Sequence, residues 1–186
     1  MAKQLDSITP VLREFIERQP LFFVGTAGAE GRVNLSPKGL DSLRILSPHR
    51  VAWLSVTGSG NETAAHVLEN RRMTLMFCAF SGPPLILRLY GTAQVYYPRH
   101  PAWNALLERF PALPGTRQIF VLEVNLVQTS CGMAVPLMNV VGEREALSAH
   151  NAGRTLEQER DYWTAKNTRS LDGKPTGIFE DVPEQA

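Results

Sequence analysis

The sequence predicts a mainly β protein, folded as an antiparallel β-barrel with flanking helices, and three observations support this class. Six or so segments have the composition of long strands, and few helices lie between them to join parallel neighbours. Residues 117–130 alternate apolar and polar side chains, as a half-exposed antiparallel strand does. The chain of 186 residues has the length of one domain, and its apolar share of 44% can fill a core.

The elements follow in order from the N-terminus. Thr9 is a suitable N-cap for a first helix, with Pro10 at the first helical position. Residues 21–27 and 32–38 flank a Gly-rich turn and predict a β-hairpin. Residues 51–57, rich in β-formers, predict a third strand.

Residues 39–50 have turn signals at both ends, and we predict neither a helix nor a strand there. A Gly-Ser turn precedes a helix over residues 61–70, for which Asn61 is the expected cap, and Gly91 predicts a β-bulge. After Cys131 the chain becomes polar and irregular, and we expect a partly ordered tail at its end. The remaining elements are strands at 72–80, 85–97 and 117–130 and helices at 100–110 and 154–167.

Charge and cysteine content narrow the function. The net charge of +1 provides no basic excess for binding duplex nucleic acid or an anionic membrane. No apolar run is long enough for a membrane helix, and the N-terminus has no signal-peptide core. Cys78 lies in an apolar strand and Cys131 has no CxxC partner, so we expect a reducing, cytoplasmic location.

Most familiar catalytic motifs are absent. The sequence contains no GxGxxG after a strand, no P-loop and no GxSxG nucleophile elbow. The four histidines lack the spacing of a metal site, so we predict no metal. No residue is nominated as a catalytic acid, base or nucleophile.

The first place where binding chemistry could lie is RVNLSPKG, residues 32–39. Strand alternation puts Arg32, Asn34 and Ser36 on one face, and Lys38 adds a second cation. This face could hydrogen-bond a polar planar ligand. The alternative is that it meets water on a half-exposed sheet.

The second place is LSVTGSGNETAAH, where a strand ending in Thr57 runs through a Gly-rich turn into a helix. The exposed N–H groups of the helix start, with the hydroxyls of Ser59 and Thr63, could cradle a phosphate. Glu62 would compete for the same positive end of the helix, and a plain capped helix is the alternative.

The third place is Arg88, a lone cation in an apolar strand, which should have a carboxylate or a bound anion as its partner. Together, the three places suit a phosphorylated planar cofactor.

These segments give the chain a resemblance to the pyridoxamine 5′-phosphate oxidase-like family of FMN-binding split barrels. RVNLSPKG, SVTGSGNETAAHVLENRRMTLMF and LRLYGTAQV carry the resemblance, which covers residues 20–130. It implies an antiparallel split β-barrel and a homodimer with FMN at the subunit interface. It also implies an FMN-dependent oxidoreductase that acts on a small-molecule substrate.

The resemblance assigns phosphate binding to Arg32 and Lys38, and it places the other polar residues along the flavin. Arg88 matches a family arginine in the strand that leads to the glycine. The cofactor-binding positions implied in this way are Arg32, Asn34, Ser36, Lys38, Thr57, Asn61, Thr63 and Arg88.

Three departures separate the chain from the oxidase itself. Glu62 and Thr63 stand where the oxidase has a basic pair, and Ile86 stands where the family has a glutamine. The tail reads KNTRSLDGKPTGIF in place of the substrate motif of the oxidase. We therefore expect a substrate other than pyridoxamine phosphate.

Two alternatives remain open. The first is a non-catalytic flavin- or haem-binding split barrel, for which His66 and Cys131 are the axial ligands to test. The second is a reductase that uses the deazaflavin F420, whose acidic tail calls for more basic groups.

We expect an FMN-binding domain at residues 1–150, including the N-terminal helix. Residues 151–186 then form a C-terminal helix and tail that pack on the barrel or on the dimer partner.

Overall fold

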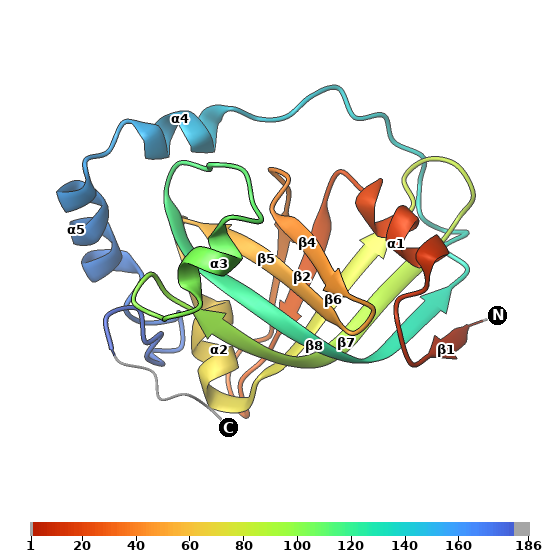
Figure 1. Cartoon of the computed structure of the whole chain (residues 1–186), viewed down its shortest axis with the longest axis horizontal. Helices are drawn as coiled ribbons and strands as arrows, with labels where there is room; N and C mark the ends of the chain where they lie inside the picture. The colour runs from red at the N-terminus through yellow and green to blue at the C-terminus, as the bar shows by residue number, and fades with distance from the viewer. Residues whose placement is uncertain (1, 181–186) are drawn as a thin grey trace.

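The centre of the molecule is one antiparallel sheet that curls into a half-barrel (Figure 1). The computed structural model describes residues 2–180, and part of the expected tail, residues 181–186, lies outside them. The eight-stranded sheet has the order β3-β2-β6-β7-β8-β5-β4, and β1 pairs with β8 beside this path. The predicted class, mainly β with an antiparallel barrel and flanking helices, is confirmed.

The strands are β1 (Lys3–Leu5), β2 (Phe22–Thr26), β3 (Asn34–Lys38), β4 (Leu43–Ser47), β5 (Arg50–Val56), β6 (Arg72–Cys78), β7 (Ile86–Tyr96) and β8 (Thr116–Ser130). The helices are α1 (Pro10–Glu17), α2 (Glu62–Asn70), α3 (Trp103–Leu107), α4 (Ala146–Ala152) and α5 (Leu156–Lys166).

Helix α1 begins as its sequence predicts. The Thr9 hydroxyl accepts a hydrogen bond from the Leu12 amide at 3.3 Å, and Pro10 occupies the first turn, where its missing N–H costs nothing. The helix buries Leu12, Phe15 and Ile16 against the sheet.

The longest strands, β7 and β8, pair along their whole length and form the middle of the sheet. Their register shifts between Tyr90 and Gly91, which confirms the predicted β-bulge. A Cβ atom at Gly91 would collide with the main-chain carbonyl of Glu123 on β8, so the close approach of the two strands requires glycine here.

Both faces of the sheet are covered. The interior of the half-barrel packs fully buried residues such as Val24, Leu75 and Leu122. On the other side, Trp103 and Leu106 lie over residues of β5, β7 and β8. The site described below lies at the open side of the half-barrel, beside the edge strand β3.

Three elements were not predicted. Strand β1 is three residues long and depends on pairing with residues 127–129, which are distant in the sequence. Strand β4 lies within residues 39–50, where Arg44 interrupts the apolar pattern. Helix α4 has one buried residue, so no apolar stripe marks it in the sequence.

The C-terminal part of the chain lies against the barrel. After β8, residues 131–145 run as coil along one edge of the molecule to α4 and α5 (Figure 1). Helix α5 begins with a capping box between Thr155 and Gln158 and buries no side chain. The residues after α5 are more deeply buried than the helix itself. The buried ones are Asn167, Ser170, Thr176, Gly177 and Ile178. We call residues 167–178 the C-terminal strap.

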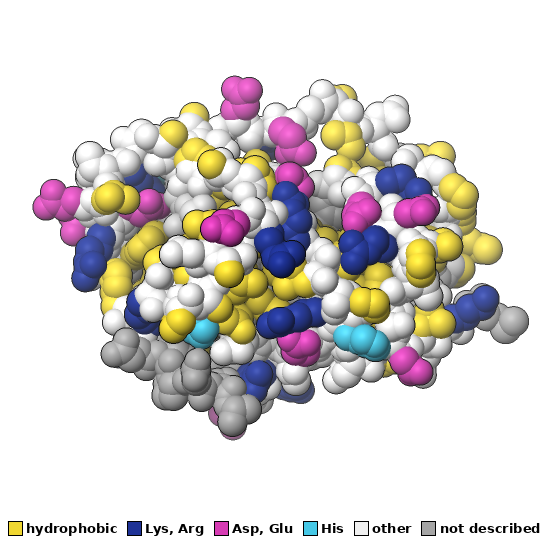
Figure 2. Space-filling view, in the orientation of Figure 1, with side chains coloured by type: hydrophobic (Ala, Val, Ile, Leu, Met, Phe, Trp, Pro, Cys, Tyr) yellow, Lys and Arg dark blue, Asp and Glu magenta, His cyan; other side chains and the backbone are white. Residues whose placement is uncertain are grey.

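The surface has no single-sign field on the face shown in Figure 2, where Lys and Arg side chains alternate with Asp and Glu. Within residues 2–180, no helix has both the length and the apolar character needed to cross a membrane.

Candidate functional site

Strand β3 presents its polar residues inward and its apolar residues outward. Val33, just before the strand, and Leu35 are 77% and 64% exposed, whereas Asn34, Ser36 and Lys38 are half-buried. An edge strand over an apolar core would show the opposite pattern. The inward side of β3 therefore faces a polar space.

That space is a cavity of about 860 Å³. Its walls are β3, β5, the turn at residues 57–61, the start of β8 and residues 140–147. The volume lies in the usual range for small-molecule and cofactor sites. Apolar groups, with Trp53 the largest, line it beside the polar ones.

Lys38 enters the cavity at the end of β3. Its Nζ lies 5.4 Å from the centroid of the Trp53 ring, a cation–π distance. Burial, followed by the nearby charge of Arg117, lowers the pKa of Lys38 to about 8, and Glu62 opposes this shift. No carboxylate of the described residues forms an ion pair with Lys38.

Arg117, at the start of β8, is the second cation of the cavity and is only 4% exposed. Its Nη1 donates to the Asn167 Oδ1 at 2.8 Å and to the Gly60 carbonyl at 3.1 Å. Its Nη2 donates to the Ser55 hydroxyl at 3.3 Å. Burial lowers the pKa of Arg117 to about 10, although Tyr97 and the two carboxylates Glu62 and Glu159 oppose the shift.

The sequence analysis missed Arg117. The signal that could have identified it is the one applied to Arg88, a cation within a strand of mostly apolar residues. In the structure Arg117 is the deeply buried cation that lines the cavity, whereas Arg88 is half-exposed and lies outside it.

Asn61 and Thr57 line the cavity, but their side chains also hold the turn and the C-terminal part in place. Asn61 accepts from the Gln118 amide at 2.6 Å and donates to the main-chain carbonyl of Asn167 at 3.2 Å. It occupies the N-cap position of α2, yet its side chain makes no capping hydrogen bond. Thr57 accepts at 2.8 Å from the indole N–H of Trp163 on α5.

Asn34 is held by a chain of hydrogen bonds that leads into the core. Its Nδ2 donates to the Thr63 hydroxyl at 3.1 Å and reaches the Thr26 hydroxyl at 3.5 Å. The Thr26 hydroxyl lies 3.1 Å from Nδ1 of His66, which is fully buried. Burial is the largest cause of the lowered pKa of His66, which favours its neutral form.

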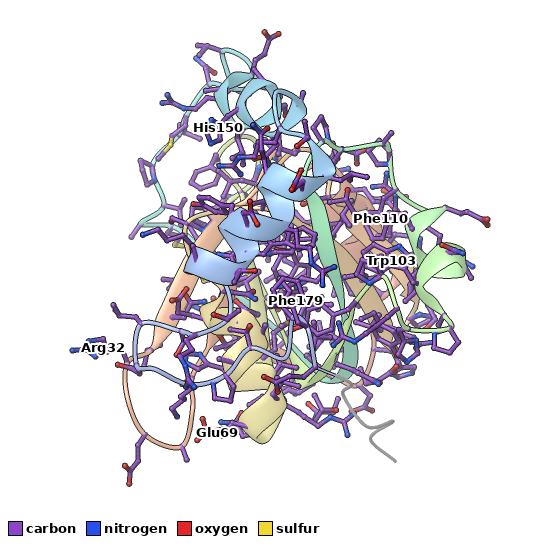
Figure 3. The ribbon with its side chains drawn as sticks, turned by 90° about the vertical axis from the view of Figure 1, so that its left-hand side faces the viewer. Arg32, Glu69, Trp103, Phe110, His150 and Phe179 are labelled. Carbon is purple, nitrogen blue, oxygen red and sulfur yellow. The ribbon has the colours of Figure 1, made fainter. Side chains whose placement is uncertain are left out.

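Arg32 and Arg88 lie outside the cavity. Arg32 points outward, at the periphery of Figure 3, and pairs with Asp172 of the C-terminal strap. Arg88 donates to the Ser130 hydroxyl at 3.2 Å. The structure thus brings the other predicted residues together along the cavity: Asn34, Ser36, Lys38, Thr57, Asn61 and Thr63.

The two residues considered for axial ligation of haem are also elsewhere. His66 and Cys131 do not line the cavity, and Cys131 is exposed. Within the described residues, no cluster of three His, Cys, Asp or Glu side chains could hold a metal ion.

Comparison with known proteins places this chain in a family. The sequence profile described as pyridoxamine 5′-phosphate oxidase matches residues 8–131, from α1 to the end of β8. The chain belongs to the pyridoxamine 5′-phosphate oxidase family. The resemblance found in the sequence is thereby confirmed at the level of the family.

A curated relative covers the C-terminal part as well. The chain is 38% identical over 188 residues to the pyridoxamine 5′-phosphate oxidase family protein ustO of Aspergillus flavus, an alignment that spans 91% of this chain and 76% of that protein.

Solved structures support the fold. HupZ of Group A Streptococcus matches with a TM-score of 0.54 at 20% identity, over 66% of this chain and 99% of its own. A provisional pyridoxamine 5′-phosphate oxidase of Lactobacillus delbrueckii matches with a TM-score of 0.53 at 19% identity, over 66% of this chain and 94% of its own. Both similarities concern the split-barrel fold of the family.

Proposed function

We propose that this protein binds FMN in the cavity beside β3 and acts as a cytoplasmic, FMN-dependent oxidoreductase on a small molecule. The observation that carries the proposal is the composition of the cavity wall. An aromatic side chain, the cations Lys38 and Arg117, and buried polar atoms without hydrogen-bond partners among residues 2–180 line a single space in a chain of this family. Within the same residues neither cation forms an ion pair with a carboxylate. The partners of the Arg117 side chain there are Asn167, Gly60 and Ser55.

The residues present fit such a ligand. The Ser36 hydroxyl and the Gln118 Oε1 are buried and have no hydrogen-bond partner among the described residues. A ligand with polar ring edges would satisfy groups of this kind, which otherwise cost free energy. Trp53 and Leu54 supply apolar surface beside them.

Within this proposal, Lys38 binds the anionic part of the cofactor, and Asn34, Ser36, Thr57, Asn61 and Thr63 border its polar edges. Because the amide group of Asn34 already donates to Thr63, its Oδ1 is left to accept a hydrogen bond from the ligand. The roles of Arg32 and Arg88 remain sequence-based predictions. Bound FMN would supply hydride or electron transfer, and the protein would bind and orient it.

We also propose that the protein is a homodimer. The outward residues Val33 and Leu35 lie beside the cavity on the exposed edge of the sheet. Residues 131–145 add the exposed apolar side chains Met133, Leu137 and Val141. A second copy would cover apolar surface of this kind. Sedimentation at micromolar concentration should give the mass of a dimer, and a monomer would contradict the proposal.

The cofactor is tested by the absorption spectrum of the protein purified without added cofactor, with mass spectrometry of what denaturation releases. We expect a flavin spectrum and released FMN. A Soret band would establish haem instead, and released F420 would establish the deazaflavin. A colourless protein that binds none of the three would refute the proposed function.

A further inference from the structure

Arg117 is a buried arginine whose hydrogen bonds leave part of its guanidinium unused. A guanidinium has five N–H donors. Nη1 uses its two on Asn167 and Gly60, and Nη2 uses one on Ser55. The N–H of Nε is buried without a partner among the described residues, and Nη2 keeps a second N–H.

The two nitrogens that retain a donor lie on the same edge of the guanidinium plane. This edge, formed by Nε and Nη2, is one of those through which arginine binds a carboxylate or a phosphate with two parallel hydrogen bonds. Glu62 and Glu143 also line the cavity, but within residues 2–180 no carboxylate forms an ion pair with Arg117. Glu62 accepts from the Leu171 amide at 3.1 Å, and Glu159 accepts from the Thr57 hydroxyl at 2.6 Å.

Lys38 supplies a second positive charge in the same cavity. Its charge and that of Arg117 repel one another, which contributes to the lowered pKa of Lys38. No carboxylate of residues 2–180 forms an ion pair with either cation, and two unpaired like charges are unfavourable in a partly buried space. A bound anion would remove that cost.

The position of Arg117 depends on the C-terminal strap. Asn167 is fully buried, and its Oδ1 accepts from Arg117 while its Nδ2 donates to the Gly58 carbonyl at 3.2 Å. Its own main-chain carbonyl accepts from Asn61 and from the Thr176 hydroxyl. Asn167 of the strap therefore holds the guanidinium through Nη1, which is not one of the two nitrogens that keep an unused donor.

We propose that Arg117 and Lys38 form an oxyanion subsite that binds a carboxylate or phosphate group of a ligand, with Arg117 held in place by Asn167. The subsite belongs to the cavity assigned above to FMN, and only the identity of its ligand rests on that assignment. The oxyanion is either the phosphate of the flavin or an acidic group of the substrate, which sits beside the flavin.

The first experiment measures anion binding by the full chain freed of cofactor, by calorimetry at pH 7 and constant ionic strength, with inorganic phosphate and acetate as probes. Arg117→Gln and Lys38→Met should each weaken binding of the better probe roughly tenfold or more, the usual effect of losing a charge-assisted hydrogen bond. Lys38→Met tests the subsite even if Arg117→Gln does not fold, because the side chain of Lys38 makes no hydrogen bond within residues 2–180.

Two control variants remove a cation outside the cavity. Lys166→Met changes an exposed residue of α5, and Arg50→Gln changes a half-exposed residue of β5 that pairs with Glu123. Both should bind the probe within about twofold of the unaltered protein. If neither probe binds the unaltered protein, or if the cavity variants bind as the controls do, the subsite is refuted.

The second experiment identifies the source of the anion by comparing FMN with riboflavin, which lacks the phosphate. If the cavity variants weaken FMN but not riboflavin, and FMN blocks the probe, the subsite holds the flavin phosphate. If FMN-loaded protein still binds the probe through Arg117, the subsite holds an acid group of the substrate. Probe binding without any flavin binding would refute the proposed function alone, and flavin binding with variant-independent probe binding would refute the subsite alone.

Discussion

The cations of this protein fall into two regions that the structure treats differently. On the surface around the C-terminal strap, two cations have carboxylate partners, in the pairs Arg32–Asp172 and Lys174–Glu69. Figure 3 shows Arg32 and Glu69 at the periphery of the molecule. Inside the cavity, Lys38 and Arg117 are less exposed than Arg32 and have no carboxylate partner among the described residues.

The difference is opposite to what stability alone would favour. An exposed cation costs little free energy when it has no carboxylate partner, because water and salt screen its charge. A buried cation without a partner costs much more free energy, and buried cations are therefore usually paired. The placement of unpaired charge in the cavity is therefore a cost that the unliganded protein bears, and it indicates that binding rather than folding accounts for these two residues.

The largest expected effect comes from the residue that holds the buried cation. Asn167→Ala would remove the acceptor of Arg117 and the donor to Gly58 inside the protein. We expect the free energy of unfolding to fall by about 2–4 kcal/mol, since a buried charge would lose a hydrogen-bond partner. Urea denaturation measures this change.

Asn125→Ala is the matched control, because Asn125 is exposed on β8. We expect its unfolding free energy to change by less than about 0.5 kcal/mol, as is usual for surface positions. Equal effects of the two substitutions would show that the strap does not support Arg117.

A smaller effect of opposite sign is expected at Lys38. Lys38→Met removes a charge that burial and Arg117 disfavour, so the unliganded protein should gain about 1 kcal/mol. Thermal unfolding of the variant, with Lys166→Met as control, measures the gain. Destabilisation by Lys38→Met would contradict the account of Lys38 as a binding residue.

The same charge predicts a pH dependence. Because the folded protein lowers the pKa of Lys38 from 10.5 to about 8, the unfolded chain binds more protons between these values. The contribution of Lys38 to stability should therefore rise as the pH increases from about 8 towards 10.5. The difference in melting temperature between unaltered protein and Lys38→Met should narrow over this range, and a constant difference would contradict the shift.

The smallest effect is expected at the paired surface cation. Arg32→Ala removes an ion pair whose arginine side chain is 72% exposed. The Arg32 amide, which donates to the Asp172 Oδ2 at 2.7 Å, remains in the variant. We expect the free energy of unfolding to fall by less than about 1 kcal/mol, and by less still in high salt. A loss as large as that of Asn167→Ala would remove the distinction between the two regions.

The sequence predicts the parts of the fold that local patterns encode. The cap and proline of α1 and the bulge at Gly91 follow from residues near one another in the chain. Strand β1 does not, because its pairing with residues 127–129 is entirely long-range. The predicted half-exposed alternation over residues 117–130 is wrong for the first half of β8, where residues 117–122 are all buried. Six of the residues that the family resemblance implied, from Asn34 to Thr63, line the cavity, and their role in binding stays a prediction.

The sequence did not indicate how the cavity is completed. From the sequence, Arg117 cannot be distinguished from the other polar residues of its strand. Only the fold brings it into the same cavity as Lys38. Asn61 reads as a helix cap, although its side chain is occupied by Gln118 and by the C-terminal strap. In both cases the deciding partner is distant in the sequence, and the partner on the strap, Asn167, has no pattern that marks it.

The hydrogen bond between Arg117 and Asn167 crosses the boundary of the family profile. The family profile ends at residue 131, before any residue of the strap begins. A fragment cut at that boundary would keep every strand of the sheet and lose the hydrogen bonds that orient Arg117 and Asn61. Relatives that share the barrel but end in a different tail would then differ in what their cavities recognise, even where their strands align residue for residue.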